Sequence, residues 1–254
     1  MRIETIYRYP VKGLTAEALE EVTLTPGQTL PEDRRFALAQ GDAPFDTAAP
    51  GWLPKRNFGC LMVNARLALV HSAFDARTGN LLLRIPGEAP LLASTRTEEG
   101  RAAIAAALTA FLAEEARGTP RFVEAPGHSF TDNAKKVVSI IGLSSLHALE
   151  HVGGMALDPL RFRANVYVSG GSPWAEFDWI GQEIQLGQAK LRVVKRIVRC
   201  PATEVNPATG ERDAEPPRWL RTHFRHIDLG VYAEVIEGGR VAVGDALEAL
   251  APTG

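Results

Sequence analysis

The residue of this chain with the most evident chemistry is Cys200, which follows a basic and apolar run at 193–199. Three cations closely precede the cysteine: Lys195, Arg196 and Arg199. Positive charge favours a thiolate over a thiol, and the thiolate is the form that binds a metal or acts as a nucleophile. Turn-forming residues at 206–210 follow, so we expect Cys200 at the edge between a strand and a loop. The common alternative is a cysteine buried as a small apolar residue.

A second polar group, formed by Arg161, Arg163 and Asn165, alternates with apolar residues at the start of another expected strand. In an extended chain this alternation places the three side chains on one face. Guanidinium groups bind phosphate and other oxyanions through paired hydrogen bonds, so the group is a candidate anion site. A solvated strand end has the same local pattern, and both interpretations stay open.

Three other basic residues, Lys12, Arg34 and Arg35, carry less information when each is taken alone. Lys12 lies in a loop bounded by proline and glycine, where a lysine is usually just exposed. Arg34 and Arg35 follow two acidic residues directly. That spacing is also typical of surface ion pairs, which contribute little stability.

A zinc-peptidase pattern, H-x-x-E-H, is present at His147, Glu150 and His151. Two histidines one helical turn apart can bind a metal while the glutamate acts as a general base. The chain offers no identifiable third ligand, and exposed or capping histidines are the alternative. His223 and His226 lie in a basic stretch, and we assign them no role.

Composition limits the classes of function. The chain has 254 residues, which is enough for one large domain or two small ones. Its 45% hydrophobic and 23% charged residues are typical of a globular protein. The 28 Lys and Arg nearly balance the 30 Asp and Glu, so no overall basic field favours nucleic-acid binding.

The sequence gives no sign of a secretory signal or of a membrane helix, which needs roughly 20 apolar residues. The two cysteines, Cys60 and Cys200, are too few for a disulfide framework, a four-cysteine zinc site or a cysteine-ligated iron–sulfur cluster. We therefore expect a cytoplasmic protein without a Cys60–Cys200 disulfide, in which Cys60 is a buried packing residue.

Hydrophobic patterning predicts a mainly β fold with a few helices, of the α+β class. The expected strands are 3–9, 19–24, 35–39, 61–70, 81–85, 137–141, 164–168, 183–186, 190–198 and 240–250. One helix is expected over 97–116, with Thr95 and Glu98 as a capping box, and a second opens at 142–144 and stops at Gly153. This predicts two β-rich modules, at 1–95 and 121–254, joined by a connecting helix within 96–120.

Six stretches of the chain, taken in order, carry a resemblance to a known family. They are 9–13 (Tyr-Pro-Val-Lys-Gly), 33–38, 161–166, 174–181, 199–210 and 243–245. Together they resemble a MOSC domain protein with the MOSC N-terminal β-barrel domain. The chain is similar in this respect to the amidoxime-reducing component and to the bacterial hydroxylaminopurine-resistance proteins.

The resemblance implies a molybdenum cofactor (molybdopterin), with Cys200 as the catalytic residue and the molybdenum ligand. The cofactor-binding residues that it implies are Lys12, Arg34, Ser144, Arg163 and Asn165. Ser144 would contribute its hydroxyl or a helix-terminal amide. A soft thiolate suits a metal already held by dithiolene sulfurs, and arginine and lysine suit the cofactor's phosphate. Gly13 stands where the family often has a serine, so one polar donor is missing.

The implied activity is a molybdenum-cofactor-dependent reduction that removes oxygen from small N-hydroxylated substrates, independently of pyridoxal phosphate. The implied partners are separate electron-transfer proteins with iron–sulfur, flavin or haem groups, and neither nucleic acid nor a membrane. One alternative from another class stays open: a MOSC protein that carries sulfur or binds the cofactor without reductase activity. In that case Cys200 would bear a persulfide or hold the cofactor for delivery.

Overall fold

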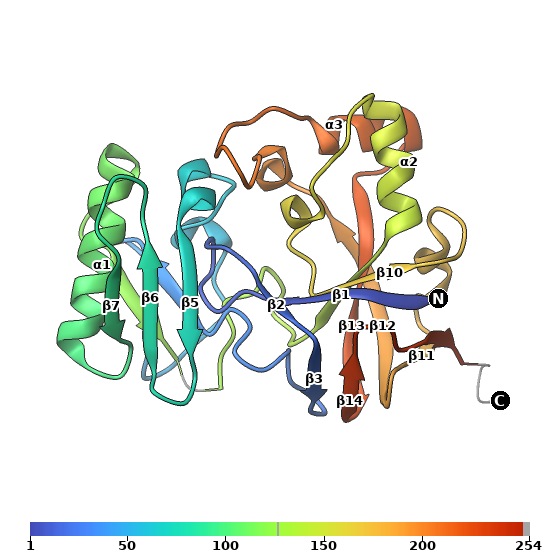
Figure 1. Ribbon diagram of the computed structural model, residues 1–254, viewed down its shortest axis with the longest axis horizontal. Helices are drawn as coiled ribbons and strands as arrows, with labels where there is room; N and C mark the ends of the chain where they lie inside the picture. The colour runs from blue at the N-terminus through green and yellow to red at the C-terminus, as the bar shows by residue number, and fades with distance from the viewer. Residues whose placement is uncertain (126, 251–254) are drawn as a thin grey trace.

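The fold is mainly β with a few helices, as predicted, and is divided into two halves that lie side by side (Figure 1). The computed structural model describes residues 1–125 and 127–250. In the view of Figure 1, one half lies on the left around α1 (Glu98–Leu112) and the other lies on the right under α2 (Leu143–Gly153) and α3 (Pro216–Trp219).

The right half is built on a mixed sheet in which eight strands lie within the described residues. Their spatial order is β15 (Leu247–Ala249), β11 (Glu183–Leu186), β12 (Ala189–Val198), β13 (Asp228–Glu237), β9 (Val138–Gly142), β10 (Val166–Ser169), β1 (Arg2–Arg8) and β2 (Glu17–Leu19). All neighbours are antiparallel except β9 and β10, which are parallel. The apolar face of this sheet forms the larger core, which includes the buried residues Ile3, Ile6, Ile140 and Val231.

The first strands of the chain belong to this right half. β1 pairs with β10, with Ile6 opposite Val166, and β3 (Glu21–Leu24) pairs with β14 (Gly239–Ala242). A register shift in β1 between Ile3 and Thr5 lets both Ile3 and Ile6 be buried in the core, while Arg2 and Glu4 are exposed. The chain therefore begins in the right half with β1 to β3, forms the left half next, and returns to the right half from β9 onward.

The left half contains a three-stranded sheet, β5 (His71–Asp75), β6 (Asn80–Arg84) and β7 (Leu91–Ser94). It also contains the pair of β4 (Phe36–Ala39) and β8 (Arg121–Glu124). α1 packs on β7 and β8 through buried residues such as Ile104 and Leu108. The helix is thus a structural part of this half, and the predicted boundaries at 95 and 120 remain predictions.

Most expected strands are confirmed within one or two residues, and four expectations are wrong. The run 19–24 is divided at Glu20 into β2 and β3, which belong to different sheets. The run 61–70 forms a turn and the short 3-10 helix η2 (Ala65–Leu69) because Asn64 fixes the turn: its Oδ1 accepts from the amide of Cys60. Such short apolar runs look alike as strand and as helix. The run 240–250 is split into β14 and β15. The N-cap of α1 is Thr97, which accepts from the amide of Gly100, whereas Thr95 bonds to Gly79 O.

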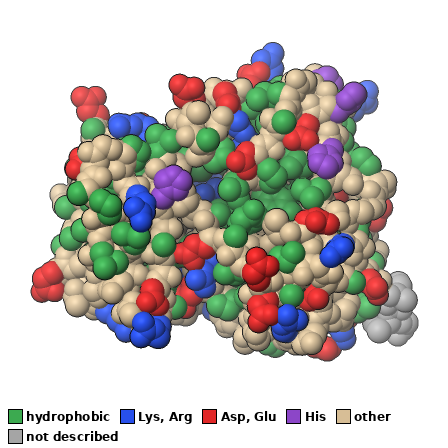
Figure 2. All heavy atoms as spheres, in the orientation of Figure 1, with side chains coloured by type: hydrophobic (Ala, Val, Ile, Leu, Met, Phe, Trp, Pro, Cys, Tyr) green, Lys and Arg blue, Asp and Glu red, His purple; other side chains and the backbone are tan. Residues whose placement is uncertain are grey.

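Four strands, β5, β7, β8 and β13, were not expected, although the pattern of β13 carries the signal. Val231, Ala233 and Val235 alternate along this strand and are buried. It pairs with β12 on one side and β9 on the other. Within the described residues, no helix is long and apolar enough to cross a membrane. On the face drawn in Figure 2, acidic and basic side chains are intermingled at the rim, and apolar side chains gather near the centre.

Gly230 provides a test of this packing. Its φ is 77°, and a Cβ added there would lie 2.4 Å from Ile140 O of β9. We expect Gly230→Ala to lower the free energy of unfolding by about 3 kcal/mol or more, because strain and a backbone clash combine. Gly87→Ala is the matched control: its φ is 83°, no described atom lies within 4 Å of the added carbon, and we expect a loss of about 1 kcal/mol. Urea unfolding measures both, and equal losses would contradict the clash.

Candidate functional site

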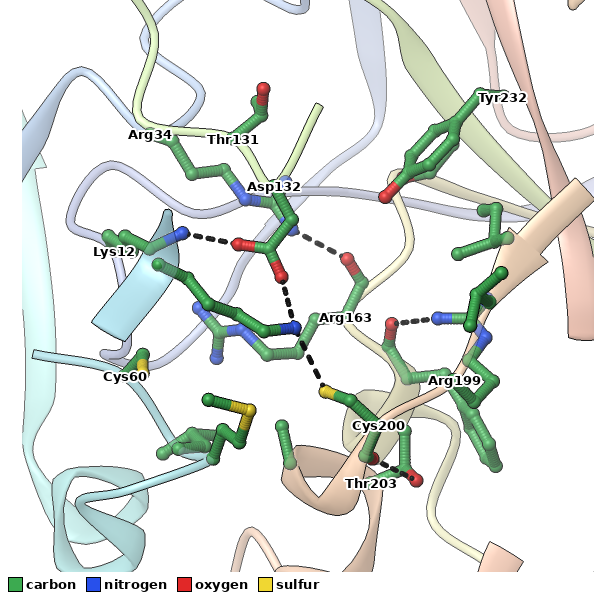
Figure 3. Close-up of a pocket in the computed structure, with 18 of the residues that line it drawn as sticks. Lys12, Arg34, Cys60, Thr131, Asp132, Arg163, Arg199, Cys200, Thr203 and Tyr232 are labelled. Atoms are coloured by element: carbon green, nitrogen blue, oxygen red, sulfur yellow. Dashed lines mark hydrogen bonds and ion pairs between the residues drawn. The ribbon is translucent and has the colours of Figure 1, made fainter. Parts of the chain in front are cut away.

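A cavity of about 370 Å³ lies where the two halves meet, and it is lined by residues from both (Figure 3). The left half and its loops contribute residues such as Lys12, Arg34 and Lys55. The right half contributes Arg163, Arg199 and Cys200. The structure thus brings together five of the six site residues predicted from sequence, namely Lys12, Arg34, Arg163, Asn165 and Cys200.

Cys200 lies just beyond the end of β12 and is the N-cap of the short 3-10 helix η6 (Pro201–Glu204), which confirms its place between strand and loop. Its backbone is extended, and its carbonyl accepts from both the amide and the hydroxyl of Thr203 at 3.0 Å. The side chain is partly exposed and is not in a disulfide. A fixed backbone therefore presents a free thiol to the cavity.

The cation that contacts this thiol is Lys55, from the short 3-10 helix η1 (Lys55–Asn57) of the other half. Its Nζ lies 3.1 Å from Cys200 Sγ and 3.0 Å from Asp132 Oδ2. Burial works against the charge of Lys55, but Asp132 and then Cys200 raise its pKa above the ordinary value. Lys55 therefore stays an ammonium group, and it places a positive charge 3.1 Å from the Cys200 sulfur.

The cations that precede Cys200 in sequence also line the cavity, but their charged groups have other partners than the Cys200 sulfur. The guanidinium of Arg196 lies 4.2 Å from the centre of the Phe177 ring, and Lys195 lies 5.9 Å from that of Tyr232. Arg199 is buried and donates to the carbonyl oxygens of Phe162 and Leu229. Arg199 thus holds the end of β12 in place.

Asp132 joins two lysines across the cavity. Its Oδ1 lies 2.5 Å from the Nζ of Lys12, which is 7% exposed and also donates to Phe130 O at 2.8 Å. Its Oδ2 accepts a hydrogen bond from the Nζ of Lys55 at 3.0 Å. Desolvation works in the opposite direction, but the two ammonium groups hold the pKa of Asp132 well below its ordinary range. The carboxylate therefore stays charged.

Arg34 and Arg163 lie against the same aromatic ring. Both guanidinium carbons are 4.3 Å from the centre of the Tyr9 ring. Arg34 is paired with Asp33 at 2.6 Å and donates to Arg163 O at 2.7 Å. Arg163 donates to Leu14 O at 2.7 Å, while its Nη2 is buried without a hydrogen-bond partner among the described residues. Burial lowers the pKa of Arg163 to about 10.

Both arginines have left-handed backbones, with φ of 48° at Arg34 and 53° at Arg163. Strained backbones of this kind cluster at functional sites. The unpartnered Nη2 of Arg163 also indicates a binding site, because a buried guanidinium donor without an acceptor is well suited to an anionic ligand.

Family models match the two parts of the chain separately. The MOSC N-terminal beta barrel domain matches residues 1–122, and the MOSC domain matches residues 126–248. The chain belongs to the MOSC domain family. The cavity with Cys200 therefore lies between the two domains that the family models define.

Two curated proteins are similar over parts of the chain. Mitochondrial amidoxime-reducing component 1 of Mus musculus is 30% identical over 97 residues, which cover 34% of this chain and 28% of that protein. Molybdenum cofactor sulfurase of Anopheles gambiae is 36% identical over 80 residues, which cover 30% of this chain and 10% of that protein. The matched regions thus span well under half of either relative.

A solved structure, the YuaD protein from Bacillus subtilis, aligns with 98% of this chain and 94% of its own at 15% identity and a TM-score of 0.45. We draw no conclusion from this likeness.

Asn165 and Ser144, which were also predicted to bind the cofactor, already form hydrogen bonds within the chain. Asn165 lines the cavity, but its Oδ1 accepts from Ser139 and its Nδ2 donates to Tyr7 O. Ser144 opens α2 as expected, yet it lies outside the cavity and donates to Gly171 O. The start of α2 faces Glu176, which accepts from the Gly142 amide and the Ser145 hydroxyl. We therefore leave Ser144 out of the candidate site.

Arg161 braces the loop after Cys200. It is buried, pairs with Asp213 at 2.6 Å and donates to Glu204 O at 3.0 Å. Gly13 lines the cavity with a φ of 87°, and a Cβ there would lie 3.0 Å from Gly59 O. A side chain at this position would be strained, which explains the glycine.

The histidines of the zinc pattern do not form a metal site. His147 and His151 are exposed, and Glu150 accepts from the amide of Leu157 at 2.7 Å. Within residues 1–125 and 127–250, no group of three or more His, Cys, Asp or Glu is arranged to hold a metal ion. His226 packs edge-on against Trp174, and burial lowers its pKa.

Cys60 is buried, as expected, although it also lines the cavity. Burial raises the pKa of its thiol, which lowers the reactivity of Cys60.

The contact between Lys55 and Cys200 gives a test of thiol reactivity. We expect Lys55→Met to slow alkylation of Cys200 by iodoacetamide at pH 7 by about 3–10-fold, because the reacting sulfur loses the ammonium group that contacts it. Mass spectrometry of the Cys200 peptide measures the rate. Lys190→Met, which removes a lysine paired with Glu237 on the surface, is the matched control and should leave the rate unchanged. An unchanged or faster rate in Lys55→Met would contradict the assignment.

Proposed function

We propose that this MOSC protein binds the molybdenum cofactor in the cavity, with Cys200 as the molybdenum ligand, and reduces N-hydroxylated compounds. The names of its two curated relatives refer to molybdenum cofactor and to amidoxime reduction, which supports a function associated with that cofactor. The observation that carries the proposal is the free thiol of Cys200 in one cavity with Lys12, Arg34 and the orphaned donor of Arg163.

The donor set fits such a group. A thiolate is a soft ligand of the kind that suits a metal held by sulfur. Lys12, Arg34 and Arg163 are hard cationic donors that suit a phosphate. The cavity volume of about 370 Å³ is within the usual range for a small-molecule site. Soft and hard donors in the same cavity match a cofactor that has a metal at one end and a phosphate at the other.

In the proposed reaction the N–O bond of the substrate breaks, and the oxygen leaves as water after the uptake of two electrons and two protons. The bound cofactor supplies the two-electron redox chemistry. The chain's own residues fix the cofactor: Cys200 by its sulfur, and Arg34 and Arg163 by their charge. Lys55 holds a positive charge 3.1 Å from the Cys200 sulfur.

The electrons come, in this proposal, from separate proteins that carry iron–sulfur, flavin or haem groups. The chain has two cysteines, which are too few to ligate an iron–sulfur cluster by cysteine alone. Val198 at the edge of the cavity is 65% exposed, so the end of β12 is accessible to a partner.

A second candidate function is that of a sulfur carrier or cofactor-binding protein without reductase activity. The accessible thiol of Cys200 beside the Lys55 ammonium favours it, because such a thiol can attack the outer sulfur of a donor persulfide and take it over while the donor leaves as a thiolate. This candidate predicts cofactor or persulfide on the protein without turnover of N-hydroxylated substrates.

The deciding experiment uses protein from a host that makes molybdenum cofactor. We expect stoichiometric molybdenum and pterin in the wild type, and a loss of most molybdenum in Cys200→Ala, because the sulfur ligand is gone. Elemental analysis and pterin fluorescence measure both. Cys60→Ala, which removes the other thiol of the same cavity, is the matched control and should retain molybdenum.

Reduction of an N-hydroxylated base by chemically reduced protein then separates the two candidates. Turnover that is lost in Cys200→Ala supports the reductase, and bound cofactor without turnover supports the carrier. A wild type without molybdenum and pterin from a competent host would contradict both cofactor-binding versions.

A further inference from the structure

The Asp132 carboxylate is the one acidic group that lines the cavity within the described residues, and it pairs with two of the cavity's lysines. It contacts Lys12 at 2.5 Å and Lys55 at 3.0 Å through different oxygens. Figure 3 shows its carboxylate beside Lys12, with Arg34 and Arg163 nearby. Two ammonium groups of the cavity thus share one carboxylate of the chain.

We propose that the Asp132 carboxylate holds the place of an anionic ligand group between Lys12 and Lys55, and that it competes with a phosphate-bearing ligand for these lysines. The inference rests on the proposed function only in that the ligand there carries a phosphate. Asp132 therefore lowers the affinity of the cavity for such a ligand, whereas Lys12 and Lys55 raise it.

The surroundings of Asp132 make displacement feasible. Its side chain is 42% exposed, whereas the two lysine side chains that it bridges are 8% and 25% exposed. Asp132 lies in the loop that joins β8 to β9, outside any helix or strand. Lys12 keeps a second acceptor, Phe130 O, when the carboxylate leaves. The anion can therefore turn into solvent while the cations stay in place.

The position of Asp132 also distinguishes it from the other acidic partners at the site. Asp33 is buried, and it accepts both from Arg34 and from the amide of Tyr9, so it is part of the fold. The carboxylate of Asp132 has ammonium partners alone among the described residues. It neutralises charge without fixing a backbone segment through its side chain.

Calorimetric titration of the cofactor-free protein with inorganic phosphate tests this inference. We expect Asp132→Asn to bind phosphate at least about fivefold more tightly than the wild type at low ionic strength, because one competing charge near the lysines is removed. The gain should disappear in Lys12→Met/Asp132→Asn, which lacks one of the released cations. Thermal unfolding without phosphate shows that each variant is folded.

Asp178→Asn is the matched control, since it makes the same charge change at an exposed carboxylate that does not line the cavity. Equal affinities of Asp132→Asn and Asp178→Asn would overturn the proposal, and so would weaker binding by Asp132→Asn or no binding by either. Because the titration involves neither molybdenum nor reduction, it separates the two proposals. Tighter phosphate binding in a protein that never acquires molybdenum would support this inference while the proposed function fails.

Discussion

The structure depends most on the gathering of positive charge around one cavity between two domains. Like charges repel, and the desolvation of each guanidinium or ammonium group is unfavourable unless a partner compensates for it. The fold compensates for these charges in three ways: carboxylates pair with Arg34, Lys12 and Lys55, carbonyl oxygens accept from Arg199, and the Tyr9 ring lies beside Arg34 and Arg163. Among the residues that the structure describes, two buried guanidinium nitrogens of the cavity lack a partner, the Nη2 of Arg163 and the Nε of Arg161. Such a site is stable as built, yet it still favours an added anion.

The path of the chain explains how these cations meet. β1 is a strand of the right-hand sheet, and the segment after it runs directly into the left half. Tyr9 sits at this crossing, where its amide donates to Asp33 and its carbonyl accepts from the amide of Arg34. The loop that carries Arg163 packs on the same ring. Because the crossing is tied to the larger core through Ile3 and Ile6, both arginines are fixed relative to Cys200 by the sheet itself.

The sequence predicted the groups whose signal is local and missed those whose partners are distant. Cys200 was recognisable from its turn, and Lys12, Arg34 and Arg163 from short motifs. Lys55 has no local signal: its contacts with Asp132 and Cys200 span 77 and 145 residues. Asn165 was placed correctly at the cavity, but a donor pattern cannot show that Ser139 and Tyr7 already use its amide. The strand β13 was not expected even though its buried residues Val231, Ala233 and Val235 alternate in the sequence, as they do in a strand.

The loop after Cys200 shows why the thiol needs both domains. Arg212 donates to Leu61 O at 3.0 Å and Met62 O at 2.9 Å in one half, and to Pro201 O at 2.5 Å in the other. Arg161 ties the same loop through Glu204 O. The backbone around Cys200 is therefore held on both sides, while its sulfur stays partly exposed beside a cation from the opposite domain. A rigid backbone with an accessible sulfur is the combination that ligation of a bound metal requires, because the ligand must be preorganised without being covered.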